Sequence, residues 1–169
     1  MQKPAKMSVR YPWIAEHRGG PLTKEQHRQL MHWARECIMR VLPLLGEQVD
    51  PRLMHALEVT KAWEAGEVSV GDARNAAFGA IAVANQSGSP VAIAVARGVG
   101  HTVATAHMAD HAPGGAEYAL KALAAAGKPI EEERAWQNAQ LPQEIKNLVL
   151  TDREKKSWFW KKQIEGVRK

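Results

Sequence analysis

The stretch AIAVANQSGSPVAIAVARGVGHTVATAHMADH, residues 80–111, decides the fold. Two runs built mostly from Ala, Val, Ile and Gly meet at the Ser-Gly-Ser-Pro break of residues 87–90. The sequence AIAVA occurs in both runs, at residues 80–84 and 92–96, which indicates two equivalent helices packed together. Because helices that are apolar nearly all round are buried, we predict a central Ala/Gly-rich helical hairpin.

Signals for helix starts continue on both sides of this hairpin. Thr23 and Gln26 form a capping-box pattern, and Asp50-Pro51 joins an N-cap residue to a proline at the first helical position. The fourth helix is expected to reach Asp110 or His111, with Pro113-Gly114-Gly115 as its stop. In all, the predicted helices begin near Thr23, Asp50, Ser69, Ser89, Gly115, Pro129 and Pro142. The seventh has a candidate break near Thr151-Asp152. Since no segment shows sustained strand alternation, the predicted fold class is all-α, a single compact bundle of about seven helices.

Three regions are expected along the chain. Residues 1–22, rich in Pro and Gly, form an N-terminal arm whose Tyr11, Trp13 and Ile14 can dock on the body. Residues 23–152 form one helical domain. Residues 153–169 form a basic, Trp-rich C-terminal helix or tail.

Charge and cysteine content restrict the class of protein. The net charge is +5, but seven basic and two acidic residues lie in residues 153–169, so the positive charge belongs to the ends of the chain. The single cysteine, Cys37, cannot form an internal disulfide and is read as a small buried side chain, which favours a reducing cytoplasm. No secretion signal is recognised, and the longest apolar run, residues 91–96, is too short to span a bilayer.

Polar side chains interrupt the apolar surface of the second hairpin helix. At 100° per residue, Arg97, His101 and His111 fall on one stripe. If the two helices are antiparallel, Asp72 and Asn75 lie level with His101 and Arg97 across small residues. The candidate site residues are therefore Asp72, Arg74, Asn75, Arg97, His101, His107, Asp110 and His111.

Three interpretations of this set remain open. The first is a buried polar network that fixes the register of the helices. The second is a surface that binds a partner, with Arg and His at its centre. The third is a metal site, since His107 and His111 have the i, i+4 spacing of two ligands on one helix face, with Asp110 and His101 nearby.

Catalysis finds less support in the sequence. Gly98-Val99-Gly100 lies within a predicted helix, and not between a strand and a helix as a phosphate loop would. The Gly-x-Ser-x-Gly pattern of a nucleophile elbow is missing. We therefore expect a protein that is not an enzyme and that uses no cofactor.

The C-terminal segment KKSWFWKK, residues 155–162, interleaves lysines with large aromatic side chains. Such a segment can bind an acidic partner, a membrane surface or single-stranded nucleic acid. The alternative is a terminal helix whose Trp and Phe dock on the body while the lysines stay in water.

From about Leu22 to Thr151 the chain resembles a bacterial family of immunity proteins, the immunity-five-like domain. The segments that carry the resemblance are LTKEQHRQLMHWA (22–34), SVGDARNAAFGAIAVAN (69–85), AIAVARGVGHTVATAHMADH (92–111), AEYALKALAAAGK (116–128) and ERAWQNAQLPQEIKNLVL (133–150). The resemblance implies a protein that protects its cell from a toxin of a polymorphic or contact-dependent system.

The favoured hypothesis is thus a cytoplasmic immunity protein that binds and neutralises a cognate protein toxin without catalysis. A small metal-binding protein or metal-dependent enzyme that uses His101, His107 and His111 is one alternative. Nucleic-acid binding through the basic C-terminal tail is another, and the less favoured one. The sequence sets no oligomeric state and is compatible with a homodimer.

Overall fold

The protein was analysed as a computed structural model that describes residues 10–168. Residues 1–9 of the predicted arm and Lys169 lie outside the described part. Within it the fold is all-α and contains no strand element. The described helices are α1 (Lys24–Met39), α2 (Pro51–Glu64), α3 (Val70–Gln86), α4 (Pro90–Ala104), α5 (Ala112–Ala125), α6 (Glu131–Ala139), α7 (Gln143–Lys155) and α8 (Ser157–Val167). Short 3₁₀ turns cover Tyr11–Trp13, Glu16–Arg18, Leu42–Leu45 and Ala109–His111.

The helix starts follow the capping chemistry expected from the sequence. Thr23 and Gln26 form a complete capping box at α1. Asp50 accepts a hydrogen bond from the backbone N–H of Arg52 and is followed by a proline at the first position of α2. Ser69 and Ser89 cap α3 and α4 through their side chains. These local bonds satisfy backbone donors that a helix start leaves free, which explains why these four starts could be predicted.

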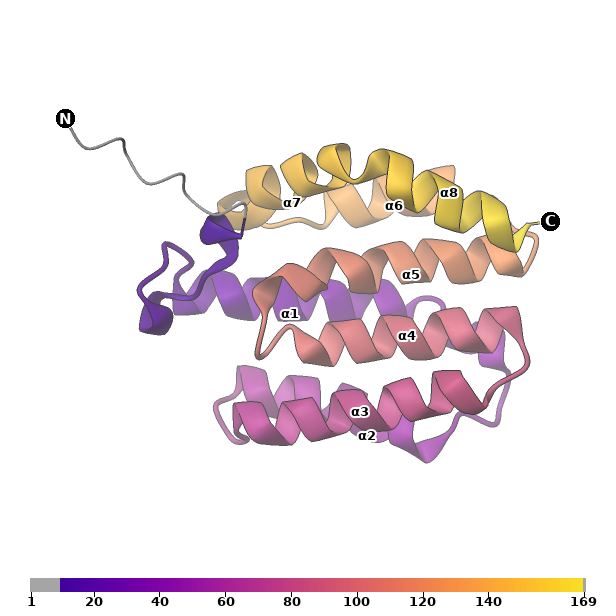
Figure 1. Cartoon of the computed structure of the whole chain (residues 1–169), viewed down its shortest axis with the longest axis horizontal. Coiled ribbons are helices and arrows are strands. Elements are labelled where there is room, and N and C mark those ends of the chain that lie inside the picture. Colours follow the sequence, from indigo (N-terminus) through magenta and orange to yellow (C-terminus); the bar gives the residue numbers. More distant parts are fainter. Residues whose placement is uncertain (1–9, 169) are drawn as a thin grey trace.

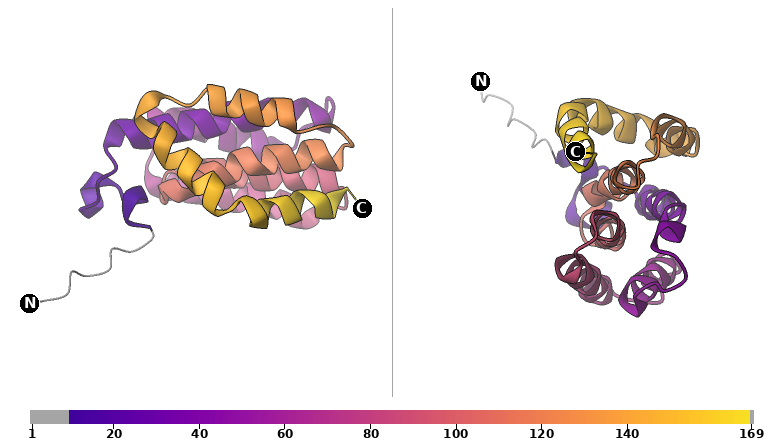
Figure 2. Two further views of the ribbon diagram at one scale, coloured as in Figure 1. Left: turned by 90° about the horizontal axis from the view of Figure 1, so that it is seen from above. Right: turned by 90° about the vertical axis from the view of Figure 1, so that its right-hand side faces the viewer.

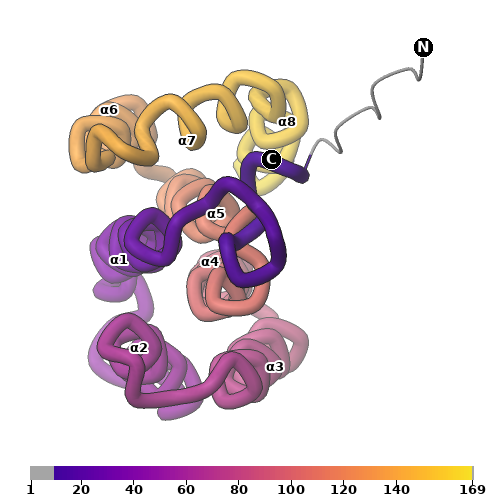
Figure 3. The backbone as a smooth tube through the Cα atoms, turned by 90° about the vertical axis from the view of Figure 1, so that its left-hand side faces the viewer, coloured from indigo at the N-terminus to yellow at the C-terminus, as the bar shows by residue number. Residues whose placement is uncertain are grey.

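Helices α3 and α4 form the predicted hairpin, with α4 in the interior of the bundle. Helix α4 lies between α3 and α5 (Figure 1), while α1 and α2 lie on its other side (Figure 3). Helix α3 buries one alanine-rich face and exposes the other. Helices α6, α7 and α8 cross over α1 and α5 as a further layer, seen from above in Figure 2.

Small residues bring α4 and α5 into close contact. A Cβ added at Gly98 would lie 2.3 Å from Cδ1 of the buried Ile38, and one at Gly115 would lie 2.5 Å from Oγ1 of Thr102. Gly114 and Gly115 are thus helical residues of α5 packed against α4. The prediction that residues 113–115 stop a helix is wrong, because Pro113 stands in the first turn of α5, where its missing N–H costs nothing.

The fourth helix is shorter than predicted. It ends at Ala104, and a turn leads to the 3₁₀ segment Ala109–His111 before α5 begins. His107 and His111 therefore do not share a helix face. The prediction of a continuous helix to residue 110 or 111 is wrong.

Both ends of the described chain pack on the body. Trp13 and Leu22 are buried in a cluster with α1, and this confirms that Trp13 docks. The predicted seventh helix is two helices that divide at Lys156, not near Thr151-Asp152. Helix α8 buries Trp160 and Ile164 against α5. The predicted docking of the aromatic side chains is therefore confirmed for Trp160, and it is wrong for Trp158 and Phe159, which are exposed.

Cys37 on α1 is fully buried, as predicted, and burial raises the pKa of its thiol far above the usual range. Among the described helices, none has the length and apolar character needed to cross a membrane.

Candidate partner-binding face

Three imidazoles gather where α4 ends and α5 begins. His101 comes from the last turn of α4, His107 from the following turn, and His111 from the 3₁₀ segment before α5. The ring centroids of His101 and His111 are 5.1 Å apart, and those of His107 and His111 are 5.4 Å apart. We call the surface around these three side chains, between the exposed Phe78 on α3 and the exposed Phe159 on α8, the histidine face.

His101 and His111 are hydrogen-bonded to each other. Their Nδ1 atoms are 3.3 Å apart, so one ring donates and the other accepts. Such a bond requires at least one neutral ring. Burial, followed by the positive potential of His111 and Arg97, lowers the pKa of His101 to about 4. Burial also lowers the pKa values of His107 and His111. The three rings are therefore neutral near pH 7.

Two hollows meet at this histidine pair. The first, of about 240 Å³, lies between α3 and α4 and is lined by Arg74, Ala77, Phe78, Ile81, Gly100, His101, Ala104, His107 and His111. The second, of about 390 Å³, reaches α8 and is lined by Arg10, His101, Asp110, His111, Pro113, Gly114, Asp152, Lys156, Phe159 and Trp160. His101 and His111 line both hollows.

The first hollow is suited to an apolar group. Its floor is made of Ala77, Gly100 and Ala104, and its rim carries Phe78 and Ile81, which are 61% and 42% exposed. Its charged lining residue is the cation Arg74, and no carboxylate from residues 10–168 lines it. The Nδ1 atom of His107 is buried and has no hydrogen-bond partner among the described residues. An exposed apolar rim beside a hollow is typical of a surface that binds another molecule.

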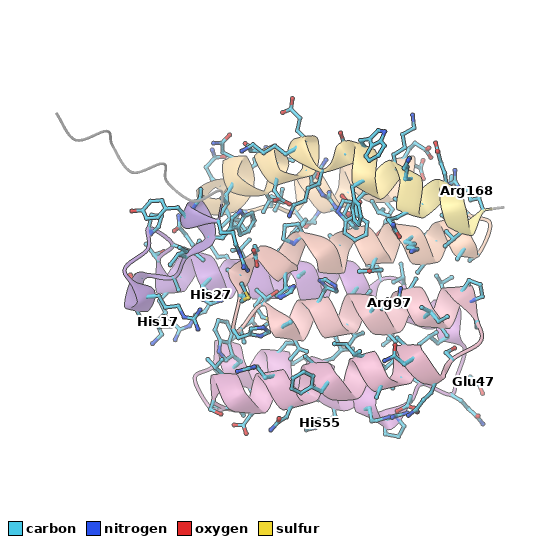
Figure 4. The ribbon with its side chains drawn as sticks, in the orientation of Figure 1. His17, His27, Glu47, His55, Arg97 and Arg168 are labelled. Carbon is cyan, nitrogen blue, oxygen red and sulfur yellow. The ribbon has the colours of Figure 1, made fainter. Side chains whose placement is uncertain are left out.

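The structure separates the predicted site residues into two groups. Arg74, His101, His107, Asp110 and His111 lie on the histidine face. Asp110 accepts a hydrogen bond from Nε of Arg10 at 2.9 Å. Asp72 and Asn75 are exposed on α3, and Arg97 is exposed on α4 (Figure 4).

The predicted pairing of Asp72 and Asn75 with Arg97 and His101 is wrong. The carboxylate of Asp72 accepts hydrogen bonds from the backbone and side chain of Ser69, which lowers the pKa of Asp72. Asp72 is thus part of the capping box that begins α3. A carboxylate three residues after a serine is a capping signal, and that local bond takes precedence over the proposed contact across the hairpin.

The metal interpretation depended on His107 and His111 sharing one helix, and they do not. Across residues 10–168 there is no group of three or more His, Cys, Asp or Glu side chains arranged to hold a metal ion.

A further histidine, His27 on α1, binds the backbone of the segment that follows α4 and leads to the histidine face. It is buried, and its Nε2 lies 2.6 Å from the carbonyl oxygen of Thr105, to which it donates. Burial lowers the pKa of His27, so the neutral ring holds the backbone just after α4. His27 was not among the predicted site residues, although His27, Leu30 and Ala34 have the i, i+3, i+7 spacing of a buried helix face.

A buried polar network lies away from the histidine face, where α5, α6 and α7 meet. Glu117 is buried, and its Oε1 lies 3.2 Å from Nε of the buried Arg153 and 3.1 Å from Nη1 of Arg134. Arg153 also donates to Oε1 of Gln137, and Nε2 of Gln137 donates to the carbonyl oxygen of Ala116. Helical spacing could not reveal this network, because its members come from three different helices.

The comparisons with known proteins agree with the resemblance seen in the sequence. The model of a protein family described as "Imm-5 like putative immunity protein" matches residues 20–144. Neither the search of curated proteins nor the search of solved structures returned a match. The matched region holds α1 to α6, and with them the three histidines and Phe78, while α8 lies beyond it.

Proposed function

From the premise that the chain belongs to the Imm-5 like family of immunity proteins, we propose that it binds a protein toxin on its histidine face and neutralises the toxin by that contact. The observation that carries this proposal is the hollow of about 240 Å³ between α3 and α4, rimmed by the exposed Phe78 and Ile81. Large side chains exposed beside a pocket are the usual anchors of protein interfaces.

The residues that line the histidine face indicate which chemical groups the toxin surface carries. Arg74 beside the first hollow, and Arg10 and Lys156 beside the second, favour a partner with carboxylates near an apolar side chain. Asp110 and Asp152 also line the second hollow, so the first hollow is the better acceptor for an acidic and apolar group.

The proposed action is binding without catalysis. The side chain of His101 pairs with another imidazole and not with a hydroxyl or thiol that it could activate. The place of action is the cytoplasm, where a lone thiol such as Cys37 stays reduced.

The test is protection of cells that express a candidate toxin, chosen from the genes that neighbour this one in its host. Co-expression of the wild-type protein is expected to restore growth, and the two proteins are expected to purify together. Phe78→Asp introduces a charge at the rim of the hollow and is expected to abolish both effects. Because Phe78 is exposed, the variant should keep the helical circular dichroism and the unfolding midpoint of the wild type.

The matched control is Met54→Asp, which places the same charge at another exposed apolar position, on α2. It is expected to protect as well as the wild type. If the wild type gives no protection and no co-purification, the proposed function is wrong. If Phe78→Asp protects fully, the toxin binds elsewhere on the molecule.

A further inference from the structure

Apart from Phe159, which borders the histidine face, the outer surface of α8 takes no part in the packing of the bundle or in the proposed toxin contact. Trp158 is 68% exposed and is the most exposed large hydrophobic side chain of the described residues. The neighbouring Phe159 is 49% exposed. Lys155, Lys161 and Lys162 are also exposed, and they form no ion pair with any described residue. We define the α8 surface as Trp158, Phe159, Lys161 and Lys162 of α8, together with Lys155 at the end of α7.

Helix α8 is held in place by its opposite side, so this exposure is not a sign of a loose terminus. Trp160 and Ile164 are buried, and Nζ of Lys121 on α5 donates to Oε1 of Gln163 at 2.9 Å. At 100° per residue, Trp158 lies about 160° around the helix from Trp160 and about 120° from Ile164. The helix runs along the edge of the molecule, away from α2 and α3 (Figure 1).

We infer that the α8 surface binds the headgroup region of an anionic lipid bilayer, with α8 lying in the plane of the membrane. Residues 154–168 carry five basic and two acidic residues, Glu154 and Glu165, so the segment is attracted to a negative surface. Indole rings favour the boundary between headgroups and acyl chains, where one part of the ring is apolar and another is wet. Lysines beside them reach the phosphates.

Stacking of a single-stranded nucleic acid fits the geometry less well. The ammonium of Lys162 lies 4.2 Å from the centroid of the Trp158 ring and covers one face of it. The ring of Phe159 packs edge-to-face on Trp160 at 5.1 Å. Because consecutive residues of a helix point about 100° apart, Trp158 and Phe159 cannot form one platform for successive bases.

A protein partner fits the composition less well. Cores of protein interfaces are depleted in lysine and enriched in arginine and aromatic residues. The free cations of the α8 surface are all lysines, which act as mobile point charges that suit a field of phosphates. The proposal is independent of the toxin, because it concerns a surface beyond the region that the family model matches.

The test is co-sedimentation of the full-length protein with vesicles. We expect binding to vesicles of equal parts phosphatidylcholine and phosphatidylglycerol, and at least about tenfold weaker binding to pure phosphatidylcholine. Binding is expected to weaken as salt is added, because the attraction is screened. Vesicles with bromine on the acyl chains should quench the tryptophan fluorescence of the wild type more than that of Trp158→Ser.

Two variants locate the contact. Trp158→Ser and the double variant Lys161→Glu with Lys162→Glu alter exposed side chains and are expected to fold normally. The double variant should bind anionic vesicles at least about twentyfold more weakly, since each lysine near the membrane contributes about fivefold. The matched control, Lys24→Glu with Lys61→Glu, makes the same charge change on α1 and α2 and should bind as the wild type.

The proposal is overturned if the wild type does not bind anionic vesicles, or if the control loses as much binding as the α8 variant. It is also overturned if Trp158→Ser leaves vesicle binding and bromine quenching unchanged but abolishes binding to an oligothymidylate. That result would assign the α8 surface to nucleic acid.

Discussion

His101 is the residue whose chemistry depends most directly on its surroundings. It is enclosed by α4, the 3₁₀ segment and α5, and a Cβ added at Gly114 would lie 2.6 Å from its Nδ1. The charged or titratable groups that act on it are His111, Arg97, Asp110 and Lys156. Burial is the largest influence and favours the neutral ring.

The low pKa of His101 predicts a loss of stability in acid. The ordinary pKa of 6.5 applies to the unfolded chain, and the folded value is about 4. Between these values the unfolded chain binds the proton first, so the free energy of unfolding falls as the pH falls from 6.5 to 4. The contribution of this residue is up to about 3 kcal/mol.

Urea denaturation at a series of pH values measures this effect. His101→Gln is expected to flatten the pH dependence between pH 6.5 and 4, whereas His55→Gln, at an exposed position on α2, should leave it unchanged. An equal slope for wild type and His101→Gln would contradict the prediction.

The pair Glu117–Arg153 gives a second prediction for single residues. Arg153→Met removes one of the two cations near the buried Glu117 and is expected to lower the free energy of unfolding by about 3 kcal/mol. Adding Glu117→Gln to that variant should restore part of the loss, because the second change removes the uncompensated charge. Equilibrium unfolding in urea tests both, and additive losses would contradict the expected coupling.

At the scale of elements, the capped helix starts could be predicted and the junction of α4 with α5 could not. Thr23, Asp50, Ser69 and Ser89 act on their own next few residues, so local sequence contains the information. The stop at Ala104 has no glycine or proline to mark it. Pro113, Gly114 and Gly115 resemble a stop, yet their small size serves the packing of α5 on α4.

The candidate site could be predicted only in part. The histidines were singled out by composition, but their spatial grouping follows from the unmarked turn after α4. Asp72 was assigned to the wrong partner because helical periodicity cannot weigh a capping bond against a contact between helices. His27 and the pair Glu117–Arg153 depend on contacts between helices distant in sequence.

The close contact of α4 with its neighbours predicts opposite effects for two similar substitutions. Gly98→Ala places a methyl group against Ile38 and Tyr118 and is expected to lower stability by about 1–2 kcal/mol. Gly79→Ala, in the interior of α3, meets no atom closer than 3.9 Å and should raise stability by up to about 1 kcal/mol. Thermal unfolding of the two variants compares them directly, and a gain for Gly98→Ala would show that α4 can move away.

At the scale of the whole molecule, the described chain is a helical bundle with α8 added over α5. The body of the protein, from Tyr11 to Asp152, carries a mildly negative net charge, and the basic excess lies at the ends. The proposed membrane contact thus lies in the basic C-terminal part of the sequence, whereas the first hollow of the histidine face is lined by residues of the body.

Removal of α8 tests how far the bundle depends on this last helix. A chain that ends at Lys156 loses the burial of Trp160 and Ile164 and should be less stable by about 2–4 kcal/mol. It should still unfold in a single transition, because α1 to α5 retain their shared core. Urea denaturation followed by circular dichroism measures both quantities, and an unchanged midpoint would show that α8 contributes no stability.

Because Cys37 is buried, the reactivity of its thiol reports how often the bundle opens. A thiol with no exposed surface and a raised pKa cannot react with a labelling reagent while the bundle is closed. Its rate of modification in native buffer therefore measures how often α1 separates from its neighbours, without denaturant. For the same reason, a cysteine introduced on the surface can be labelled selectively, so a fluorophore or spin label can be attached to either proposed contact without removing a native thiol.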